Sequence, residues 1–64
     1  MTTNAEMYMK CMQIESMVKS MVIKGISDNE KLVKAVDELY HPSNEWEMEV
    51  FSEAIIYAKQ SILN

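Results

Sequence analysis

The fold is decided by residues 25–47, which read GISDNEKLVKAVDELYHPSNEWE. This stretch holds the single glycine and the single proline of the chain, Gly25 and Pro42, and a short polar side chain follows closely after each. Glycine suits the left-handed backbone that ends a helix, and proline cannot donate the hydrogen bond that continues one. The stretch therefore predicts two helix ends and two helix starts.

Helix starts are marked by a short polar side chain that precedes a glutamate by three residues, the spacing of a capping box. This spacing occurs at Thr3-x-x-Glu6, Ser27-x-x-Glu30 and Asn44-x-x-Glu47, each ahead of a segment with helical apolar periodicity. We predict helices over 4–24, 28–40 and 45–63. The chain is thus expected to be one all-α domain over 1–64, a small three-helix bundle with apolar surface to spare for a dimer.

The predicted core follows from the apolar stripe of each helix, at about 100° of rotation per residue. Sixteen residues fall on these stripes: Met7, Cys11, Ile14, Val18, Met21, Val22, Leu32, Ala35, Val36, Leu39, Met48, Phe51, Ala54, Ile55, Ala58 and Ile62. Short connections make sequential helices antiparallel neighbours, so the first and third helices should run in the same direction. The second helix is too short to cover both of them, which leaves apolar surface exposed.

Composition limits how this domain can be stabilised and where it works. A chain of 64 residues with one cysteine can form neither an intramolecular disulfide nor a cysteine zinc site. We expect no cofactor and no metal. The sequence shows no membrane-spanning apolar segment and no secretory leader, so we expect a cytoplasmic location and no membrane partner.

The charges of the chain argue against nucleic acid as a direct ligand. Six lysines and no arginine stand against ten acidic residues, for a net charge of -4. Phosphate recognition depends on clustered lysine and arginine, so direct nucleic-acid binding is not expected. The same balance favours a basic partner surface and leaves open a weak DNA mimic, for which Glu45, Glu49 and Glu53 would form a carboxylate ladder.

The sequence predicts no catalytic residue. Cys11 and His41 could form a nucleophile and base pair, but Cys11 falls on a core stripe and His41 lies beside Pro42 in a connection. We expect the Cys11 thiol to be buried and unreactive. Glu45, Glu47 and Glu49 are expected on exposed faces, without the burial that raises the pKa of a catalytic acid.

An interaction surface is predicted on the third helix instead. Trp46, Val50 and Tyr57 form a stripe separate from the core stripe, and Glu49 and Glu53 border it. Aromatic side chains inside a charged rim are typical of protein interfaces. The alternative is that the second helix crosses at an angle and covers this stripe as core.

Methionine is also unusually frequent, with seven residues in the chain. Met9 and Met12 fall outside the predicted core, and methionine adapts well to a partner surface. We assign both to the predicted interface, although methionine is equally a common core filler.

Besides the weak DNA mimic, two functions remain open from the sequence. The first is a non-enzymatic protein-binding module, an adaptor or inhibitor that docks an apolar helix face with an acidic rim on a larger protein. Small acidic proteins of phages and mobile elements and small bacterial regulators use this strategy. The second is a structural homodimer whose spare apolar surface is covered by its own copy.

Overall fold

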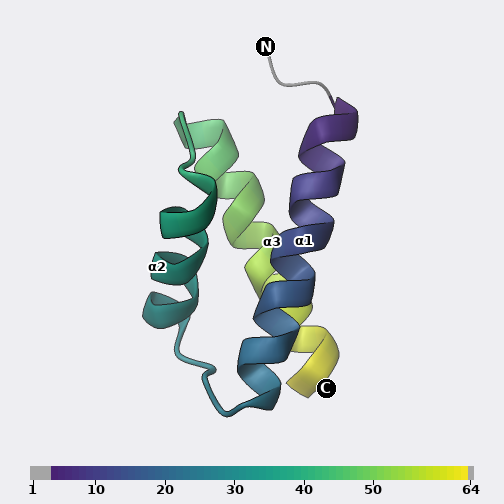
Figure 1. The fold of residues 1–64 in the computed structure, drawn as a ribbon, viewed down its shortest axis with the longest axis vertical. Coiled ribbons are helices and arrows are strands. Elements are labelled where there is room, and N and C mark those ends of the chain that lie inside the picture. Colours follow the sequence, from purple (N-terminus) through teal and green to yellow (C-terminus); the bar gives the residue numbers. More distant parts are fainter. Residues whose placement is uncertain (1–3, 64) are drawn as a thin grey trace.

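The computed structural model describes residues 4–63 and contains three helices. They are α1 (Asn4–Ile23), α2 (Asn29–Tyr40) and α3 (Glu45–Leu63). In Figure 1, α1 and α3 run in the same direction with α2 antiparallel beside them, as the short connections predict. The domain is elongated, with extents of 35 × 19 × 15 Å. The expected three-helix bundle is therefore confirmed.

The end of α1 is built by Gly25, as predicted. Gly25 has a φ of +101°, its N-H donates to the Val22 carbonyl at 2.9 Å, and the Ile26 N-H donates to the Met21 carbonyl at 2.9 Å. This pair of bonds is the Schellman arrangement, which satisfies carbonyl groups that the last helical turn leaves free. The helix ends at Ile23, one residue before the predicted boundary.

We expect Gly25→Val to lower the free energy of unfolding by about 1 to 2 kcal/mol. A Cβ at this position would meet no atom within 4 Å apart from its neighbours in the chain, so the cost comes from the positive φ and not from a clash. Urea denaturation followed by circular dichroism measures it. Gly25→Asn is the matched control and should cost less, because asparagine tolerates positive φ better than valine. An unchanged midpoint for Gly25→Val would contradict this explanation.

The start of α2 differs from the prediction. Asp28, and not Ser27, is the N-cap residue: its backbone is extended and its carboxylate accepts a hydrogen bond from the Glu30 N-H at 3.1 Å. The predicted box between Ser27 and Glu30 is therefore wrong. Aspartate is as good a cap as serine, and here it satisfies the second amide of the helix. The corresponding box at Thr3 lies outside the described residues.

The end of α2 places a non-glycine residue in the left-handed conformation. His41 has φ 47° and ψ 70°, and its N-H donates to the Asp37 carbonyl at 3.0 Å. Pro42 follows directly and has no N-H with which to extend the helix. The predicted boundary at Tyr40 is confirmed.

The start of α3 contains the predicted cap at Asn44. The Asn44 side-chain oxygen accepts from the Glu47 N-H at 2.8 Å. The Glu47 carboxylate reaches back one residue further than in a standard capping box, and accepts from the Ser43 N-H at 3.2 Å and the Ser43 hydroxyl at 3.0 Å. These three bonds fix the connection between α2 and α3.

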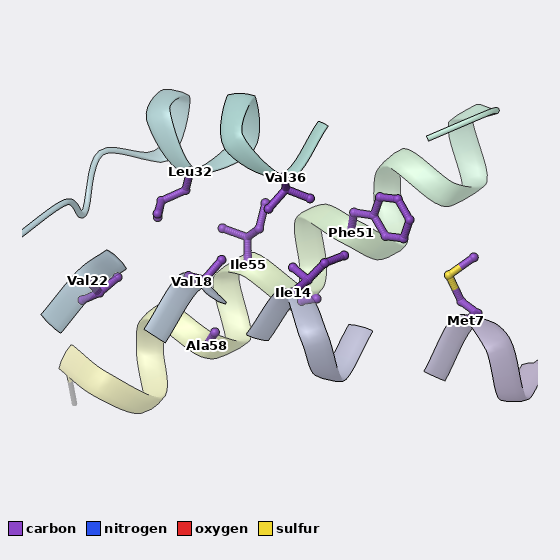
Figure 2. Packing of buried hydrophobic residues seen from close by; sticks show 10 residues of the cluster. Met7, Ile14, Val18, Val22, Leu32, Val36, Phe51, Ile55 and Ala58 are labelled. Atoms are coloured by element: carbon purple, nitrogen blue, oxygen red, sulfur yellow. The ribbon is translucent and has the colours of Figure 1, made fainter. Parts of the chain in front are cut away.

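Ten buried apolar residues form the core, and all ten belong to the predicted sixteen. They are Met7, Ile14, Val18, Val22, Leu32, Val36, Phe51, Ala54, Ile55 and Ala58. The closest packing is between α1 and α3, and α2 contacts each of them much less extensively. Figure 2 shows Leu32 and Val36 of α2 pointing toward the α1 and α3 side chains. These are the only fully buried apolar residues of α2.

Six predicted core residues are not fully buried. Cys11, Met21 and Ala35 are half-buried, whereas Leu39, Met48 and Ile62 are exposed. The inward stripe of α2 passes through Val36 to Tyr40, which turns Leu39 outward. In the first turn of α3 the inward position is taken by Glu47 and not by Met48.

The position of Ile62 follows from where α2 begins. Asn29, the first residue of α2, lies level with Lys59, whose amine donates to the Asn29 side-chain oxygen at 3.0 Å. Ile62 therefore lies beyond the level of Asn29, where no residue of α2 covers it. Within residues 4–63, no helix is both long and apolar enough to cross a membrane.

Candidate protein-interaction surface

Helix α3 carries two apolar stripes, one buried and one exposed. Its buried residues are Glu47, Phe51, Ala54, Ile55 and Ala58. Trp46, Val50 and Tyr57 lie roughly 85° to 125° around the helix from the centre of that stripe. Trp46 is 53% exposed and Tyr57 is 63% exposed, and Val50 is half-buried against the core. The alternative that α2 covers this stripe is therefore wrong.

The position of α2 explains why the stripe is free. The Tyr40 hydroxyl donates to the Gln13 side-chain oxygen at 3.4 Å. The Tyr40 ring packs edge-on against the Phe51 ring, with 6.2 Å between the ring centroids. Together with the bond between Lys59 and Asn29, these contacts place α2 on one side of the α1 and α3 pair. Trp46, Val50 and Tyr57 are rotated away from that side.

The opposite side of the pair also includes residues of α1. Helices α1 and α3 run in the same direction and their buried stripes face one another. Residues of α1 and α3 that are rotated away from these stripes in opposite senses therefore lie on the same side of the pair. Cys11, Tyr8 and Met12 are offset from the buried stripe of α1 in this sense, by roughly 25° to 125°. We call this side the uncovered face, and define it as Tyr8, Cys11, Met12, Trp46, Val50 and Tyr57.

Aromatic side chains gather on the uncovered face. The chain has five aromatic residues, of which Phe51 is buried and Tyr40 is half-buried. The other three, Tyr8, Trp46 and Tyr57, are each more than half exposed and all lie on the uncovered face. Exposed aliphatic residues such as Leu39 and Ile56, by contrast, are scattered over other sides of the bundle. Only one side therefore concentrates the residue types that dominate interface affinity.

Carboxylates border this face along α3. Glu49 and Glu53 are exposed, as predicted, and lie next to Trp46 and Val50 at a spacing of three residues. Glu45 is also exposed, but it is offset from the buried stripe toward the α2 side. On the α1 side, Glu15 and Lys19 are half-buried and stand four residues apart. The face therefore has an apolar aromatic centre and a rim with more negative than positive charge.

The structure separates the two methionines predicted for the interface. Met12 belongs to the uncovered face and is 54% exposed. Met9 is also exposed, but it lies roughly 180° from the buried stripe of α1 and points away from α3. Tyr8 was not predicted for the interface, although its spacing of four residues from Met12 places both side chains on one strip of α1.

Cys11 and His41 do not come together. Cys11 lies on the uncovered face, whereas His41 ends α2 on the other side of the α1 and α3 pair. The prediction that Cys11 is buried is wrong, because its thiol is half-buried at the edge of the α1 and α3 contact. This partial burial, together with the nearby Glu15 carboxylate, raises the pKa of the Cys11 thiol.

We expect the Cys11 thiol to react several-fold more slowly in the folded protein than in urea. The raised pKa leaves less thiolate at neutral pH, and the thiolate is the reactive form. Labelling with a chromogenic disulfide at pH 7.5 or so measures the rate. Glu15→Gln should accelerate labelling, because it removes the negative charge that disfavours the thiolate. Equal rates in the folded and unfolded states would show that neither effect operates.

Glu47 is a buried carboxylate that the sequence did not predict. It was expected on an exposed face, but its side chain is only 6% exposed. The hydrogen bonds from the Ser43 N-H and hydroxyl lower the pKa of Glu47, with a smaller contribution from Lys10, and they outweigh the opposing effect of desolvation. The ionised carboxylate therefore stabilises the start of α3 and is no candidate for a general acid.

Stability should consequently fall in acid through Glu47. The folded-state pKa is lowered, so the contribution is present above the unfolded value of about 4.3 and is lost as pH falls through the folded pKa. We expect Glu47→Gln to destabilise the domain at pH 7 and to differ less from the wild type at pH 3 or so. Urea melts at the two pH values test this. Glu49→Gln, which changes an exposed carboxylate, should remain close to the wild type.

Two hollows elsewhere on the surface are weaker candidates for a protein-binding site. A shallow hollow runs along the outer side of α2, lined by Asn29, Glu30, Val33, Lys34, Asp37, Glu38 and His41. A smaller one lies between the start of α2 and the end of α3, lined by Asn29, Ile56, Lys59, Gln60 and Leu63. Neither contains an aromatic residue or a cysteine. Among the residues that the structure describes, no group of three potential metal ligands occurs.

Comparison of the chain with protein-family models, with curated proteins and with solved structures gives no match.

Proposed function

We propose that this chain is a small non-enzymatic protein-binding module, an adaptor or inhibitor that docks its uncovered face on a larger protein. The observation that carries the proposal is the exposure of Trp46 and Tyr57 on a folded bundle, on the side that α2 leaves free. Exposed aromatic groups cost solvation free energy in the isolated domain, and a partner that buries them recovers it.

The surroundings of these aromatics support docking over chance exposure. Val50 and Cys11 are half-buried, so the centre of the face is already partly desolvated. Glu49 and Glu53 supply the charged rim. An apolar centre that excludes water within a polar border is the usual arrangement of an interface, with aromatic residues making the largest contributions to affinity.

Two other functions fit less well. A structural homodimer would use the same apolar residues, but it would set the acidic rim of one copy either against the acidic rim of the other or against its α1 side, where only Lys19 offers a positive charge. A DNA mimic needs a dense array of negative charge, whereas the carboxylate row of α3 borders an aromatic stripe that has no counterpart on a duplex. The proposed partner is therefore another protein, with a cytoplasmic location as the working assumption.

Site-directed photo-cross-linking in the native host tests the proposal. A benzophenone amino acid would replace Tyr57 on the uncovered face, and Lys34 on the outer side of α2 in a matched control. We expect the first position to cross-link one protein reproducibly and the control position to leave that protein unlinked. Failure of the Tyr57 position to yield any protein beyond the control, while the chain stays folded, would contradict the proposal.

A further inference from the structure

The row formed by Glu45, Glu49 and Glu53 indicates what kind of partner the uncovered face accepts. These residues are spaced by four along α3, so their carboxylates follow one edge of the helix at intervals of about 6 Å. Glu49 and Glu53 adjoin the stripe of Trp46, Val50 and Tyr57. Glu45 continues their row but lies roughly 100° around the helix from Trp46, toward the α2 side. Apolar and acidic side chains are thus arranged as two neighbouring lines.

The charge of this row is not neutralised within the described part of the chain. The three glutamates are exposed, and no described lysine forms an ion pair with them. The one lysine of α3 is Lys59, and its amine is bonded to Asn29 on the α2 side. Three adjacent carboxylates without a counter-charge repel one another, and this repulsion is relieved when cations are placed beside them.

We infer that the uncovered face binds an amphipathic helix that carries lysine or arginine at intervals of four beside an apolar stripe. The apolar stripe would lie over Trp46, Val50 and Tyr57, and the basic row would lie along Glu49 and Glu53, the two carboxylates next to that stripe. Side chains recur along the partner helix with the same axial spacing as along α3. A single helix can therefore place its apolar row against the aromatic stripe and its basic row against the carboxylates. The inference rests on the proposed function and names its partner class.

A second copy of the chain matches this face poorly. An antiparallel pairing of α3 on α3 would place the two carboxylate rows against each other. A parallel pairing would set the row of one copy against α1 of the other, where Lys19 is the only cation beside the apolar residues. Neither arrangement places a row of cations beside Glu49 and Glu53.

The test uses Trp46, the single tryptophan of the chain, as the reporter. The probe is a synthetic amphipathic helix of about 18 residues, five turns, with a leucine stripe and a row of lysines beside it. A control peptide keeps the leucines and has glutamate at each lysine position. We expect the lysine peptide to shift the Trp46 emission to shorter wavelength and to bind at least about tenfold more tightly than the control, with a difference that shrinks in high salt.

A matched pair of variants locates the effect. Glu49→Gln combined with Glu53→Gln should weaken the lysine peptide several-fold, up to about tenfold, since two exposed ion pairs are lost. Glu30→Gln combined with Glu38→Gln makes the same change of net charge on α2 and should have little effect. Circular dichroism checks that all variants remain folded. The salt dependence of peptide binding to the wild type tests the electrostatic contribution even if a variant does not fold.

Each contrary result has a distinct meaning. Equal affinity for the two peptides, or equal weakening by both variant pairs, overturns the basic helix as partner and leaves protein binding by the aromatic stripe intact. Absence of any emission shift with either peptide overturns the inference as well. Self-association in sedimentation equilibrium that disappears on removal of Trp46 and Tyr57 would assign the face to a second copy instead.

Discussion

Replacement of Phe51 by alanine is expected to remove a large part of the free energy of unfolding of the domain. Phe51 is 1% exposed and is the largest fully buried side chain, and its ring packs against Tyr40 at 6.2 Å. Truncation of a buried phenylalanine costs about 3 to 5 kcal/mol. A domain of this length has a total stability of about 3 to 10 kcal/mol, so the loss is a large part of the whole.

Urea denaturation followed by circular dichroism measures this effect. Tyr57→Ala is the matched control, since it removes an aromatic ring from the same helix on its exposed side. It should change the free energy of unfolding by less than about 0.5 kcal/mol. If Phe51→Ala melted at the wild-type midpoint, or if Tyr57→Ala were equally destabilising, the assignment of the two stripes of α3 would be wrong.

The fold could be predicted closely because it depends on local signals. Gly25, Pro42 and Asn44 each act within a few residues of chain, and glycine, proline and an N-cap impose their geometry in most contexts. The helix boundaries consequently agree with the prediction to within one residue. The error at Ser27 is of the same local kind, because Asp28 was an equally good cap one residue later.

The burial of individual residues could be predicted only in part, because it depends on where a helix lies relative to its neighbours. Periodicity places Leu39 and Met48 on apolar stripes, but it does not tell which edge of a stripe faces the bundle. That depends on the short length and the position of α2. Glu47 was missed for a related reason, since its burial comes from hydrogen bonds to Ser43 in the connection.

The candidate site, too, could be predicted from the sequence only within a single helix. The stripe of Trp46, Val50 and Tyr57 lies on a single helix, so periodicity could separate it from the core stripe, but the sequence left open whether the second helix covers it. Tyr8 and Met12 share a face with this stripe only because of how α1 and α3 are rotated relative to each other. The periodicity of a single helix does not determine that rotation. Met9 was assigned to the interface on composition alone, and it lies elsewhere.

Combined replacement of Trp46 and Tyr57 by alanine is expected to weaken partner binding by about 100-fold or more, with almost no loss of stability. Truncation of an aromatic residue at the centre of an interface commonly costs 2 kcal/mol or more, and two such losses amount to about 4 kcal/mol before non-additivity. The fold should tolerate the change, because both side chains are more than half exposed and none of the ten buried core residues is altered.

Two measurements on the same double variant separate its effects. Calorimetric titration with the partner identified by cross-linking, or with the lysine peptide, gives the change in affinity, and a urea melt gives the change in stability. Leu39→Ala combined with Ile56→Ala is the matched control, since it removes two exposed apolar side chains from other sides of the bundle. It should leave both quantities close to the wild type. A double variant that loses several kcal/mol of stability would show that Trp46 and Tyr57 support the fold itself, and a stable variant with wild-type affinity would place the binding surface elsewhere on the bundle.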